Sequence, residues 1–515
     1  MKPAFSHLLH LLTVLSIFTS CSTTKKSSGS RDDHKIELTF VQINDVYEIA
    51  PLSNGKEGGM ARVATLKKEY KQKNPNTLLV IAGDFVSPSV YNSLQYQGKP
   101  IRGKQMIESM NAAGMDLAVF GNHEFDIKEN ELQDRIDESN FKWISSNTFH
   151  FVNGQPVPFK RSTGEAFPKT FILQIKDADG TTAKVGFIGL TLPFNKADYV
   201  RYTDALQTAK ELYTEIKDSV DAVVAITHQS LEEDEQLAKE VPGLAAIIGG
   251  HEHDQRFKKV GKIYITKALA NAKSAYIIHL HINKKNHKLK VVPELRKLNE
   301  EVALDSATNS VVNKWNDIAN SNYSSLGFDA KKIVITEGEP LDGRESEIRN
   351  HPTNLTKLTI ASMKHVVPTA DVMLLNAGSI RVDDILQMPV TEYDIIRSLP
   401  FGGSIREVDM KGGLLMKVLD QGEKNVNIGC FLLHNDVLVH EGCGWMLNKT
   451  SIDSAKVYHV ALGEFILTGK EANLDFLNPS NPGIVKVYDP APAGDPRSDI
   501  RLAIVKYLTD SASHR

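Results

Sequence analysis

The sequence predicts an α/β protein built from two domains. Its 515 residues are too many for one ordinary hydrophobic core and suit two or three domains. From residue 36 to about residue 300, short β-rich runs alternate with helical patterns, which is typical of a layered α/β domain. A second α/β unit, with no obvious repeat of the first, follows from about residue 330.

The composition narrows the class of protein. Hydrophobic residues make up 41% of the chain and charged residues 24%, a globular balance that excludes wholesale disorder and a polytopic membrane protein. The formal net charge of −3 leaves no basic field to hold a nucleic-acid polymer, so a nucleic-acid partner would have to be small. Three cysteines are too few for a disulfide scaffold.

The first twenty residues predict export. Lys2 precedes an apolar run over residues 8–18, which is too short to span a bilayer and typical of a secretory signal peptide. The run ends in Thr19-Ser20-Cys21, and a polar spacer follows. Small residues before a cysteine resemble the lipobox of bacterial lipoproteins.

This resemblance implies that residues 1–20 are removed, that Cys21 carries a lipid, and that residues 21–35 form a spacer. The protein would then be exported and anchored to a bacterial membrane, on its periplasmic side or at the cell surface. The alternative is an ordinary signal peptide cleaved nearby, with an incidental cysteine. Because export permits oxidation, Cys430 and Cys443 either form a disulfide or remain two free thiols.

The elements follow from the periodicity of apolar residues. Strands are expected over residues 36–43, 77–81, 117–120, 184–189, 222–227, 245–248 and 274–282, and helices over residues 60–73, 103–113 and 203–218. Val311, Val312, Trp315 and Ile318 recur at helical spacing within 306–320, and a small, polar segment follows over 321–327. We therefore expect a first domain over 36–300, a connecting helix and hinge over 301–329, and a second domain over 330–515.

Five of the expected strands end in the same way, with an apolar run followed directly by a carboxylate, an amide or an imidazole. In open α/β sheets, ligands gather in the crevice outside the carboxyl ends of the strands. Each block alone has an ordinary explanation, such as a helix cap or an exposed pair of histidines, but the five together are hard to explain except as one site. Mixed Asp, Asn and His side chains suit borderline divalent ions, and the glycines beside them let the backbone approach an ion. The blocks are Asn44-Asp45, Gly83-Asp84, Gly121-Asn122-His123-Glu124, Thr227-His228 and Gly249-Gly250-His251-Glu252-His253.

These blocks resemble the motifs of the calcineurin-like metallophosphoesterase superfamily, which run D-x-H, G-D, G-N-H-[DE], H and G-H-x-H. The resemblance implies a four-layer α/β sandwich for the first domain. It also implies two divalent metal ions, Zn, Mn, Fe or Co, whose identity stays open. The ligands that it assigns are Asp45, Asp84 and His253 for one ion, and Asp84 as a bridge with Asn122, His228 and His251 for the other.

The resemblance further implies that His123 is the catalytic imidazole and that Asp126 orients it. A nearby carboxylate favours the imidazolium, which helps it to stabilise phosphate charge or to protonate a leaving group. The alternative for Asp126 is an N-cap of a helix that begins near Ile127, and the two roles are compatible.

Tyr47 stands where the superfamily has a histidine ligand. A neutral phenol with a pKa near 10 is a poor ligand for Zn or Mn. Three interpretations stay open: the first ion is held by fewer groups, Tyr47 binds as a phenolate that favours ferric iron, or Tyr47 packs beside the site. Weak or selective metal loading is the expectation.

Blocks of the second domain extend the resemblance to the 5′-nucleotidase and UDP-sugar hydrolase family, over nearly all of residues 36–510. Residues 375–381 resemble N-x-G-x-I-R, residues 399–403 resemble P-F-G, and residues 353–355 loosely resemble the block that precedes a substrate arginine. A substrate-recognition domain is thus implied, in which arginines bind phosphate and aromatic rings stack on a base. The residues concerned are Arg349 and Arg381 for phosphate, Asn376 for the base, and Phe401 and Phe465 for stacking.

Two departures from the family lie near this pocket. Pro352 replaces the glutamate expected near Arg349, and a longer loop over 468–475 follows Phe465. Either phenylalanine could instead belong to the core. Phosphate chemistry is therefore better supported than a preference for one base.

The expected function is that of an exported, lipid-anchored hydrolase of phosphate esters that depends on divalent metal ions. Its substrates would be nucleoside 5′-monophosphates, and also nucleotide sugars or nucleoside polyphosphates. One alternative is a cyclic-nucleotide phosphodiesterase. Another is a surface lipoprotein that binds nucleotides or metals without turnover. The sequence predicts no oligomeric state.

Overall fold

The computed structural model describes residues 32–194, 197–435, 438–441 and 444–513. The expected signal peptide, Cys21 and Cys443 lie outside the described residues. Cys430 is buried and makes no disulfide with a described residue. Within the described ranges, no helix is both long enough and apolar enough to cross a lipid bilayer.

The first domain contains two six-stranded sheets. The strands of the first sheet are β1 (Lys35–Ile43), β2 (Thr77–Ala82), β5 (Leu117–Val119), β6 (Lys142–Trp143), β16 (Ser274–Asn283) and β17 (Lys288–Lys297). They lie in the order β17-β16-β1-β2-β5-β6. The pairs β1–β2, β2–β5 and β5–β6 are parallel, while β16 and β17 form an antiparallel edge. Parallel strands are buried on both faces, which explains the near-continuous apolar sequences of β1 and β2.

The second sheet has a similar plan. Its strands are β9 (Thr170–Lys176), β10 (Thr182–Thr191), β12 (Ala222–His228), β13 (Ala246–Gly249), β14 (Arg256–Val260) and β15 (Ile263–Lys267). They lie in the order β14-β15-β13-β12-β10-β9, with parallel pairing from β10 through β12 and β13 to β15. The strands and helices expected from the sequence in this domain are all present. Strands β6, β9, β14, β15 and β17 were not expected: exposed residues break the apolar pattern of β9, β14 and β17, and β6 is only two residues long.

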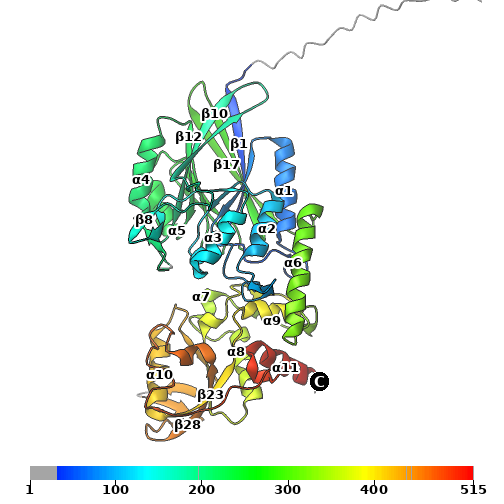
Figure 1. The fold of residues 1–515 in the computed structure, drawn as a ribbon, viewed down its shortest axis with the longest axis vertical. Coiled ribbons are helices and arrows are strands. Elements are labelled where there is room, and N and C mark those ends of the chain that lie inside the picture. The colour runs from blue at the N-terminus through cyan, green and yellow to red at the C-terminus, as the bar shows by residue number, and fades with distance from the viewer. Residues whose placement is uncertain (1–31, 195–196, 436–437, 442–443, 514–515) are drawn as a thin grey trace, which may run out of the picture.

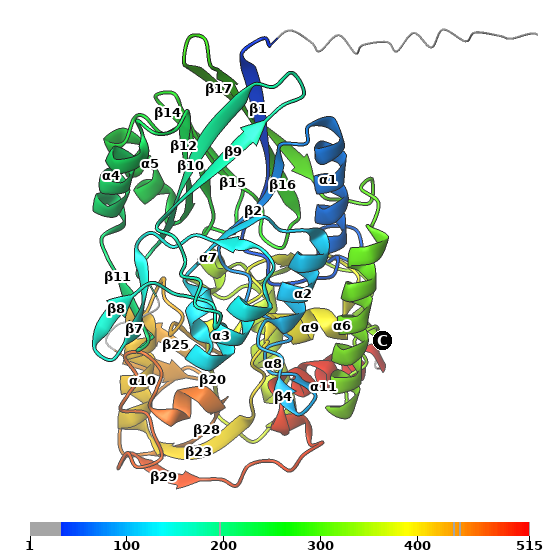
Figure 2. The ribbon, with the colours of Figure 1, turned by 45° about the horizontal axis from the view of Figure 1, so that its top comes forward.

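The two sheets pack face to face with helices outside them, so the domain has the expected four layers (Figure 1; Figure 2). Phe40 of β1 meets Phe187 of β10 between the sheets, with ring centroids 6.1 Å apart. The helices are α1 (Met60–Lys73), α2 (Lys104–Ala113) and α6 (Ser306–Ser325) on the first sheet, and α4 (Ala205–Ile216) and α5 (Leu231–Glu240) on the second. Each presents an apolar stripe to its sheet.

Shorter elements complete this domain. They are β3 (Gln95–Tyr96), β4 (Lys99–Pro100), η1 (His123–Asp126), α3 (Glu129–Glu138), β7 (Thr148–Val152), β8 (Gln155–Val157) and β11 (Val200–Tyr202). Helix α6 runs along the first domain and reaches the second (Figure 1). Residues 321–325, expected to belong to a polar hinge, are instead the last turn and a half of α6, because Tyr323 is buried and anchors that turn.

The second domain is a five-stranded sheet between helices. Its strands are β20 (Val372–Asn376), β23 (Ile405–Lys411), β24 (Leu432–His434), β28 (Val457–Gly463) and β29 (Ile484–Val487), in the order β24-β20-β28-β23-β29. Helices α8 (Asn354–Val366), α9 (Glu392–Ser398) and α11 (Ile500–Ser513) pack on one face, and α10 (Gly412–Lys424) packs on the other. This gives a three-layer α/β unit.

Short elements link the layers of the second domain. They are β18 (Ile333–Ile335), β19 (Leu341–Asp342), α7 (Glu345–Ile348), η2 (Ala377–Ser379), β21 (Ile385–Leu386), β22 (Val390–Thr391), β25 (Leu438–Glu441), β26 (Gly444–Leu447), β27 (Thr450–Ser451), η3 (Glu464–Thr468) and η4 (Pro496–Ser498). Of these, the loop between η2 and β21 contacts the first domain, because Asp383 is hydrogen-bonded to His253 and Asp384 pairs with Lys273.

Candidate metal centre and catalytic site

The five polar blocks meet at one end of the two sheets, as the sequence predicts. Asp45 follows β1 and Asp84 follows β2, while Asn122 and His123 stand on the turn after β5. His228 is the last residue of β12, and His251 and His253 follow β13. The first sheet and the second sheet therefore supply opposite walls of a single site.

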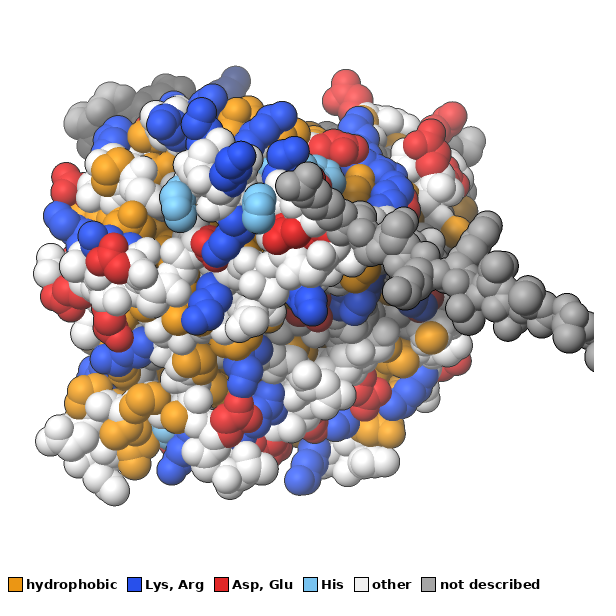
Figure 3. Space-filling view, turned by 90° about the horizontal axis from the view of Figure 1, so that it is seen from above, with side chains coloured by type: hydrophobic (Ala, Val, Ile, Leu, Met, Phe, Trp, Pro, Cys, Tyr) orange, Lys and Arg blue, Asp and Glu red, His pale blue; other side chains and the backbone are white. Residues whose placement is uncertain are grey.

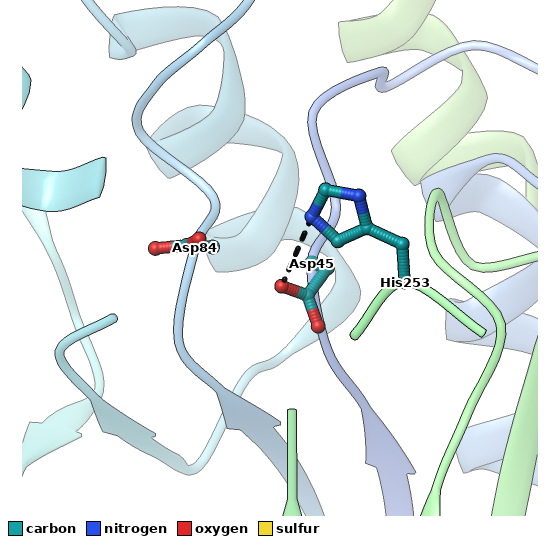
Figure 4. A group of neighbouring side chains, drawn as sticks. All are labelled: Asp45, Asp84 and His253. Atoms are coloured by element: carbon teal, nitrogen blue, oxygen red, sulfur yellow. Dashed lines mark ion pairs between the residues drawn. The ribbon is translucent and has the colours of Figure 1, made fainter. Parts of the chain in front are cut away.

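Measured distances confirm that the first group is compact. One ligand atom each from Asp45, Asp84 and His253 lie within 4.8 Å of one another. Figure 4 shows the three side chains and the pairing of His253 Nε2 with Asp45 Oδ1 at 3.6 Å. Such spacing is suited to one cation that all three donors contact.

The second group adjoins the first through Asp84. His228 Nε2 lies 3.2 Å from Asp84 Oδ2 and 3.9 Å from Asp45 Oδ1. The rings of His228 and His251 stand edge to face, with centroids 5.3 Å apart. The turn that carries Asn122 lies against Asp84, because the backbone N–H of His123 donates to Asp84 Oδ1 at 2.8 Å. Asp84 is thus the side chain that both groups share.

Buried atoms without partners test whether this donor set fits metal ions. Among the described residues, Asp45 Oδ1, Asn122 Oδ1 and His228 Nε2 are buried and accept or donate no well-aligned hydrogen bond. Leaving such a group unsatisfied costs about 1–3 kcal/mol. Carboxylate, amide and imidazole atoms are ligands of Zn, Mn, Fe and Co, so cations would satisfy all three. The residues therefore fit a metal centre.

The backbone around these donors is held in an uncommon conformation. The φ angles of Asp45, Asp84, His251 and His253 are 53°, 55°, 96° and 59°. Residues other than glycine rarely adopt such values, and they persist where the surrounding structure enforces them, often at functional sites. A Cβ on Gly121 would lie 2.1 Å from Asp84 Oδ1, so only glycine fits there. Gly121 thus lets the turn approach the candidate ligand Asp84, while its approach to an ion stays a prediction.

The charges of the group depend on one another. Burial alone would raise the pKa of Asp84, but His228 and His123 outweigh it and hold that pKa well below its usual range. Burial alone would lower the pKa of His228, yet Asp84 raises it to about 9. Burial lowers the pKa of His251 to about 3, helped by the positive charge of His228. Asp84 therefore stays ionised and can bridge two cations.

Glu124 is a residue of the site to which the sequence assigned no role. Its carboxylate accepts the backbone N–H groups of Asp84, Phe85, Val86 and Gly121 at 2.5–3.0 Å. Burial and the charge of Asp84 raise the pKa of Glu124 to about 7. These contacts hold the loop of Asp84 against the turn of Asn122. The only indication of this role in the sequence was the position of Glu124 directly after Asn122-His123.

A buried network of charged side chains supports the segment that carries His251 and His253. Lys267 Nζ lies 2.7 Å from Glu252 Oε2 and 3.0 Å from Asp234 Oδ2, and it donates to Gln229 O at 2.6 Å. Glu252 stands between His251 and His253, so its ion pair fixes the segment that carries both. In the sequence, the only indication of this network is that Lys267 stands at the end of an apolar strand.

His123 and Asp126 lie together on η1. His123 Nδ1 is 2.6 Å from Asp126 Oδ2. Burial alone would lower the pKa of His123, but the carboxylates of Asp84 and Asp126 raise it overall. The alternative N-cap role of Asp126 is wrong, because α3 begins at Glu129 and its N-cap is Lys128.

Tyr47 reaches into the donor set. Its hydroxyl lies 2.8 Å from His253 Nε2 and 3.2 Å from Asp84 Oδ2. Burial, followed by the charges of Asp84 and Asp45, raises the pKa of the phenol well above its usual value. Tyr47 therefore contacts two candidate ligands. Its own binding of an ion stays a prediction.

The second domain brings its arginines to this end of the first. Arg381 lines a small cavity with Tyr47 and Glu48. Arg349 and Arg381 share the carboxylate of Glu345, at 2.5 Å and 3.4 Å. The Nε atoms of both arginines are buried and lack a hydrogen-bond partner among the described residues. Glu345 thus joins the two guanidinium groups, and Arg381 lies beside Tyr47 at the candidate metal centre.

Asn376 and the two phenylalanines lie farther into the second domain. Asn376 is buried, donating to Glu471 Oε2 at 2.5 Å and accepting from Ser379 Oγ at 2.6 Å. Phe401 and Phe465 are 65% and 50% exposed, so the alternative that they belong to the core is wrong. Their loops adjoin, because Ser404 Oγ donates to Glu464 Oε2 at 3.0 Å. Two exposed rings on neighbouring loops are suited to stacking on a base.

Comparisons with known proteins agree with both domains. Residues 38–255 match the family of calcineurin-like phosphoesterases, and residues 333–477 match the 5′-nucleotidase C-terminal domain. The chain is 25% identical over 440 residues to the 5′-nucleotidase of Bos taurus, covering 75% of this chain and 71% of the bovine one. It is 24% identical over 511 residues to the trifunctional nucleotide phosphoesterase protein YfkN of Bacillus subtilis, covering 86% of this chain and 33% of that protein. Its fold is similar to that of the 5′-nucleotidase precursor from Thermus thermophilus, with a TM-score of 0.68 at 21% identity over 92% of this chain and 97% of the other.

Proposed function

Because the chain belongs to the 5′-nucleotidase family, with a calcineurin-like phosphoesterase domain and a 5′-nucleotidase C-terminal domain, we propose that it hydrolyses nucleoside 5′-monophosphates to a nucleoside and phosphate. Membership makes it a hydrolase of the metallophosphoesterase type. Nucleotide sugars and nucleoside polyphosphates are further substrates of the same chemistry.

One observation carries the proposal. Three buried donor atoms lack hydrogen-bond partners, Asp45 Oδ1, Asn122 Oδ1 and His228 Nε2, and they belong to the segments that meet at the carboxylate of Asp84. Asp45, Asp84 and His253 would hold one ion, and Asp84, Asn122, His228 and His251 the other. Divalent ions bound there would polarise the phosphoryl group and activate water for in-line attack.

The side chains around this centre have separate tasks. Arg381, beside Tyr47, would bind the phosphate with its planar guanidinium. His123, whose backbone touches Asp84, would donate a proton to the departing 5′-oxygen. Asp126 holds the His123 ring by its Nδ1 and favours the protonated imidazole that this step needs.

The experiment is a substrate panel with the full chain and added Mn²⁺, Zn²⁺, Co²⁺ or Fe²⁺, with phosphate release measured. We expect release from AMP and loss of that release in His123→Ala, while AMP still binds to the variant. Binding without turnover in the native protein would support a nucleotide-binding lipoprotein instead. Preference for 3′,5′-cyclic AMP would support a phosphodiesterase.

We propose further that the protein is exported and anchored by a lipid on Cys21. The described chain starts at the end of the first domain opposite the second domain (Figure 1). Lys and Arg side chains are mixed with Asp and Glu over this end (Figure 3), where Lys285 in the turn between β16 and β17 and Lys288 at the start of β17 are exposed. Metabolic labelling with palmitate should mark the native protein and not Cys21→Ser.

A further inference from the structure

His253 of the first domain is held by a carboxylate of the second. Its Nδ1 is hydrogen-bonded to Asp383 Oδ2, in the loop between η2 and β21. Its Nε2 faces Asp45 Oδ1 at 3.6 Å. One nitrogen of the ring thus points into the metal centre, while the other is bound across the contact between the domains.

Asp383 is itself fixed in place. Its Oδ1 accepts the backbone N–H of Glu345, 2.7 Å away, at the start of α7. Its φ of 39° lies in the left-handed region, which residues other than glycine rarely enter. Only 20% of its side chain is exposed. Backbone strain of this kind persists where the surroundings enforce one conformation.

We propose that Asp383 is a positioning residue that orients His253 for the first metal ion and makes this orientation depend on docking of the second domain. A carboxylate bonded to the far nitrogen of a ligating histidine fixes its tautomer and its ring orientation, and it raises the basicity of the ligating nitrogen. The inference rests on the proposed metal centre, and it is independent of which nucleotide is hydrolysed.

A reciprocal effect follows from linkage. If docking of the second domain strengthens ion binding by some factor, ion binding strengthens docking by the same factor. Part of the coupling between the two domains then passes through this hydrogen bond. Metal loading would set how firmly the arginines of the second domain are held near His123.

A neighbouring residue supplies a matched control. Asp384 Oδ2 pairs with Lys273 Nζ of the first domain at 2.6 Å, and Arg397 Nη2 lies 3.4 Å from the same oxygen. This ion pair also joins the domains, but it contacts no candidate ligand. Asp384→Asn therefore weakens the contact between the domains while leaving the bond to His253 in place.

The first measurement is the affinity of the full chain for Mn²⁺, by calorimetry and by competition with a chelator. We expect Asp383→Ala to weaken one of two binding events roughly 10- to 100-fold, which is the usual effect of removing such a partner. Asp383→Asn, which keeps an acceptor, should lose less, and Asp384→Asn should stay near the native value. Equal losses in Asp383→Ala and Asp384→Asn, or no loss in either, would overturn the inference.

The second measurement separates positioning from general destabilisation. In the Co²⁺-loaded protein, the Nδ1 proton of His253 should give a shifted proton resonance that exchanges slowly with water. This resonance should persist in Asp384→Asn and vanish in Asp383→Ala, with thermal melting used to verify that both variants fold. Its persistence in Asp383→Ala would contradict the inference. If the native protein binds two ions with this pattern and releases no phosphate from any nucleotide, the proposed substrate fails and the role of Asp383 stands.

Discussion

His123 Nδ1 lies 2.6 Å from Asp126 Oδ2, three residues further along the same 3₁₀ turn. The contact fixes the tautomer of the neutral ring, because the Asp126 carboxylate only accepts hydrogen bonds and so keeps a proton on Nδ1. It also leaves Nε2 as the atom that can face a substrate. A pair of this kind orients an acid and sets its pKa at once.

Replacing Asp126 with Asn should slow hydrolysis and shift its pH dependence. Among the groups that act on the pKa of His123, burial lowers it, while Asp84 and then Asp126 raise it. An imidazolium acid loses activity as pH rises through its pKa, so Asp126→Asn should move the basic limb of kcat/KM to lower pH. His123→Ala should lower kcat by about 10²- to 10⁴-fold. As a control, Ser87→Ala removes a weaker 3.3 Å contact to Asp126 and should leave the basic limb of the pH profile in place. If the basic limb does not move in Asp126→Asn, Asp126 does not set the pKa of His123.

Tyr47→His should strengthen metal binding. The Tyr47 hydroxyl lies 2.8 Å from His253 Nε2, inside the donor set, and burial keeps the phenol neutral by raising its pKa. An imidazole in its place offers a better ligand for Zn or Mn, so affinity for the first ion should rise about tenfold or more. Calorimetry with Zn²⁺ on both proteins measures this. Unchanged affinity and activity would mean that Tyr47 is a bystander.

Metal ions should stabilise the protein, and His228→Ala should abolish the part of the gain that the second ion supplies. Ligand at about 100 times its Kd adds about 2.7 kcal/mol to the free energy of unfolding, which raises the melting temperature by several degrees. His228 Nε2 is buried and faces Asp84 Oδ2 at 3.2 Å, while its Nδ1 is bonded to Ala82 O at 2.8 Å, so the substitution also removes native contacts and only the metal-dependent part of the melting temperature reports on ligation. Melting with and without EDTA tests this. A variant stabilised by Mn²⁺ as much as the native protein would rule out His228 as a ligand.

The sequence predicted the parts of the site that depend on strand ends. Asp84 and His228 could be found because each follows an apolar run, and strands of one sheet finish at a common edge. Gly121 could be interpreted because a tight turn beside a ligand leaves no room for a Cβ. Local pattern and general topology were sufficient there.

Other contacts could not be predicted, because they join residues that no local pattern relates. Asp383 meets His253 across 130 positions and across two domains. Lys267 pairs with Asp234 and Glu252 inside the first domain, although a buried lysine at a strand end has no signature of its own. The last turns of α6 were missed because small polar residues at 321–325 resemble a loop until the burial of Tyr323 is known.

Phe465→Ala should weaken the binding of nucleotides and spare small phosphate esters. The ring is 50% exposed, on a loop tied to that of Phe401 through Ser404 and Glu464. Stacking of a base on an aromatic ring contributes about 1–3 kcal/mol, so KM for AMP should rise about 5- to 100-fold. The matched measurement uses p-nitrophenyl phosphate, which carries no base. Equal losses on both substrates would show that the ring supports the fold and does not bind the base.

Glu48→Gln should change how stability depends on pH. Glu48 is buried at the contact between the domains, where Tyr393 Oη donates to its carboxylate. Burial raises its pKa from 4.5 to about 7, against the smaller opposite effects of Tyr393 and Arg397. Between these values the folded protein keeps a proton that the unfolded chain releases, so stability falls as pH rises from about 4.5 to 7 and the loss is complete above 7. The glutamine variant lacks this loss.

Denaturant unfolding of both proteins at pH 5, 6, 7 and 8 measures the effect. The native protein should lose on the order of 3 kcal/mol relative to Glu48→Gln across this range. Tyr393→Phe serves as the opposite test, because removing a donor to the carboxylate raises the pKa of Glu48 further and extends the loss to higher pH. A constant difference between native protein and Glu48→Gln at every pH would mean that this carboxyl titrates alike in the folded and unfolded states, and that the contact between the domains is insensitive to it.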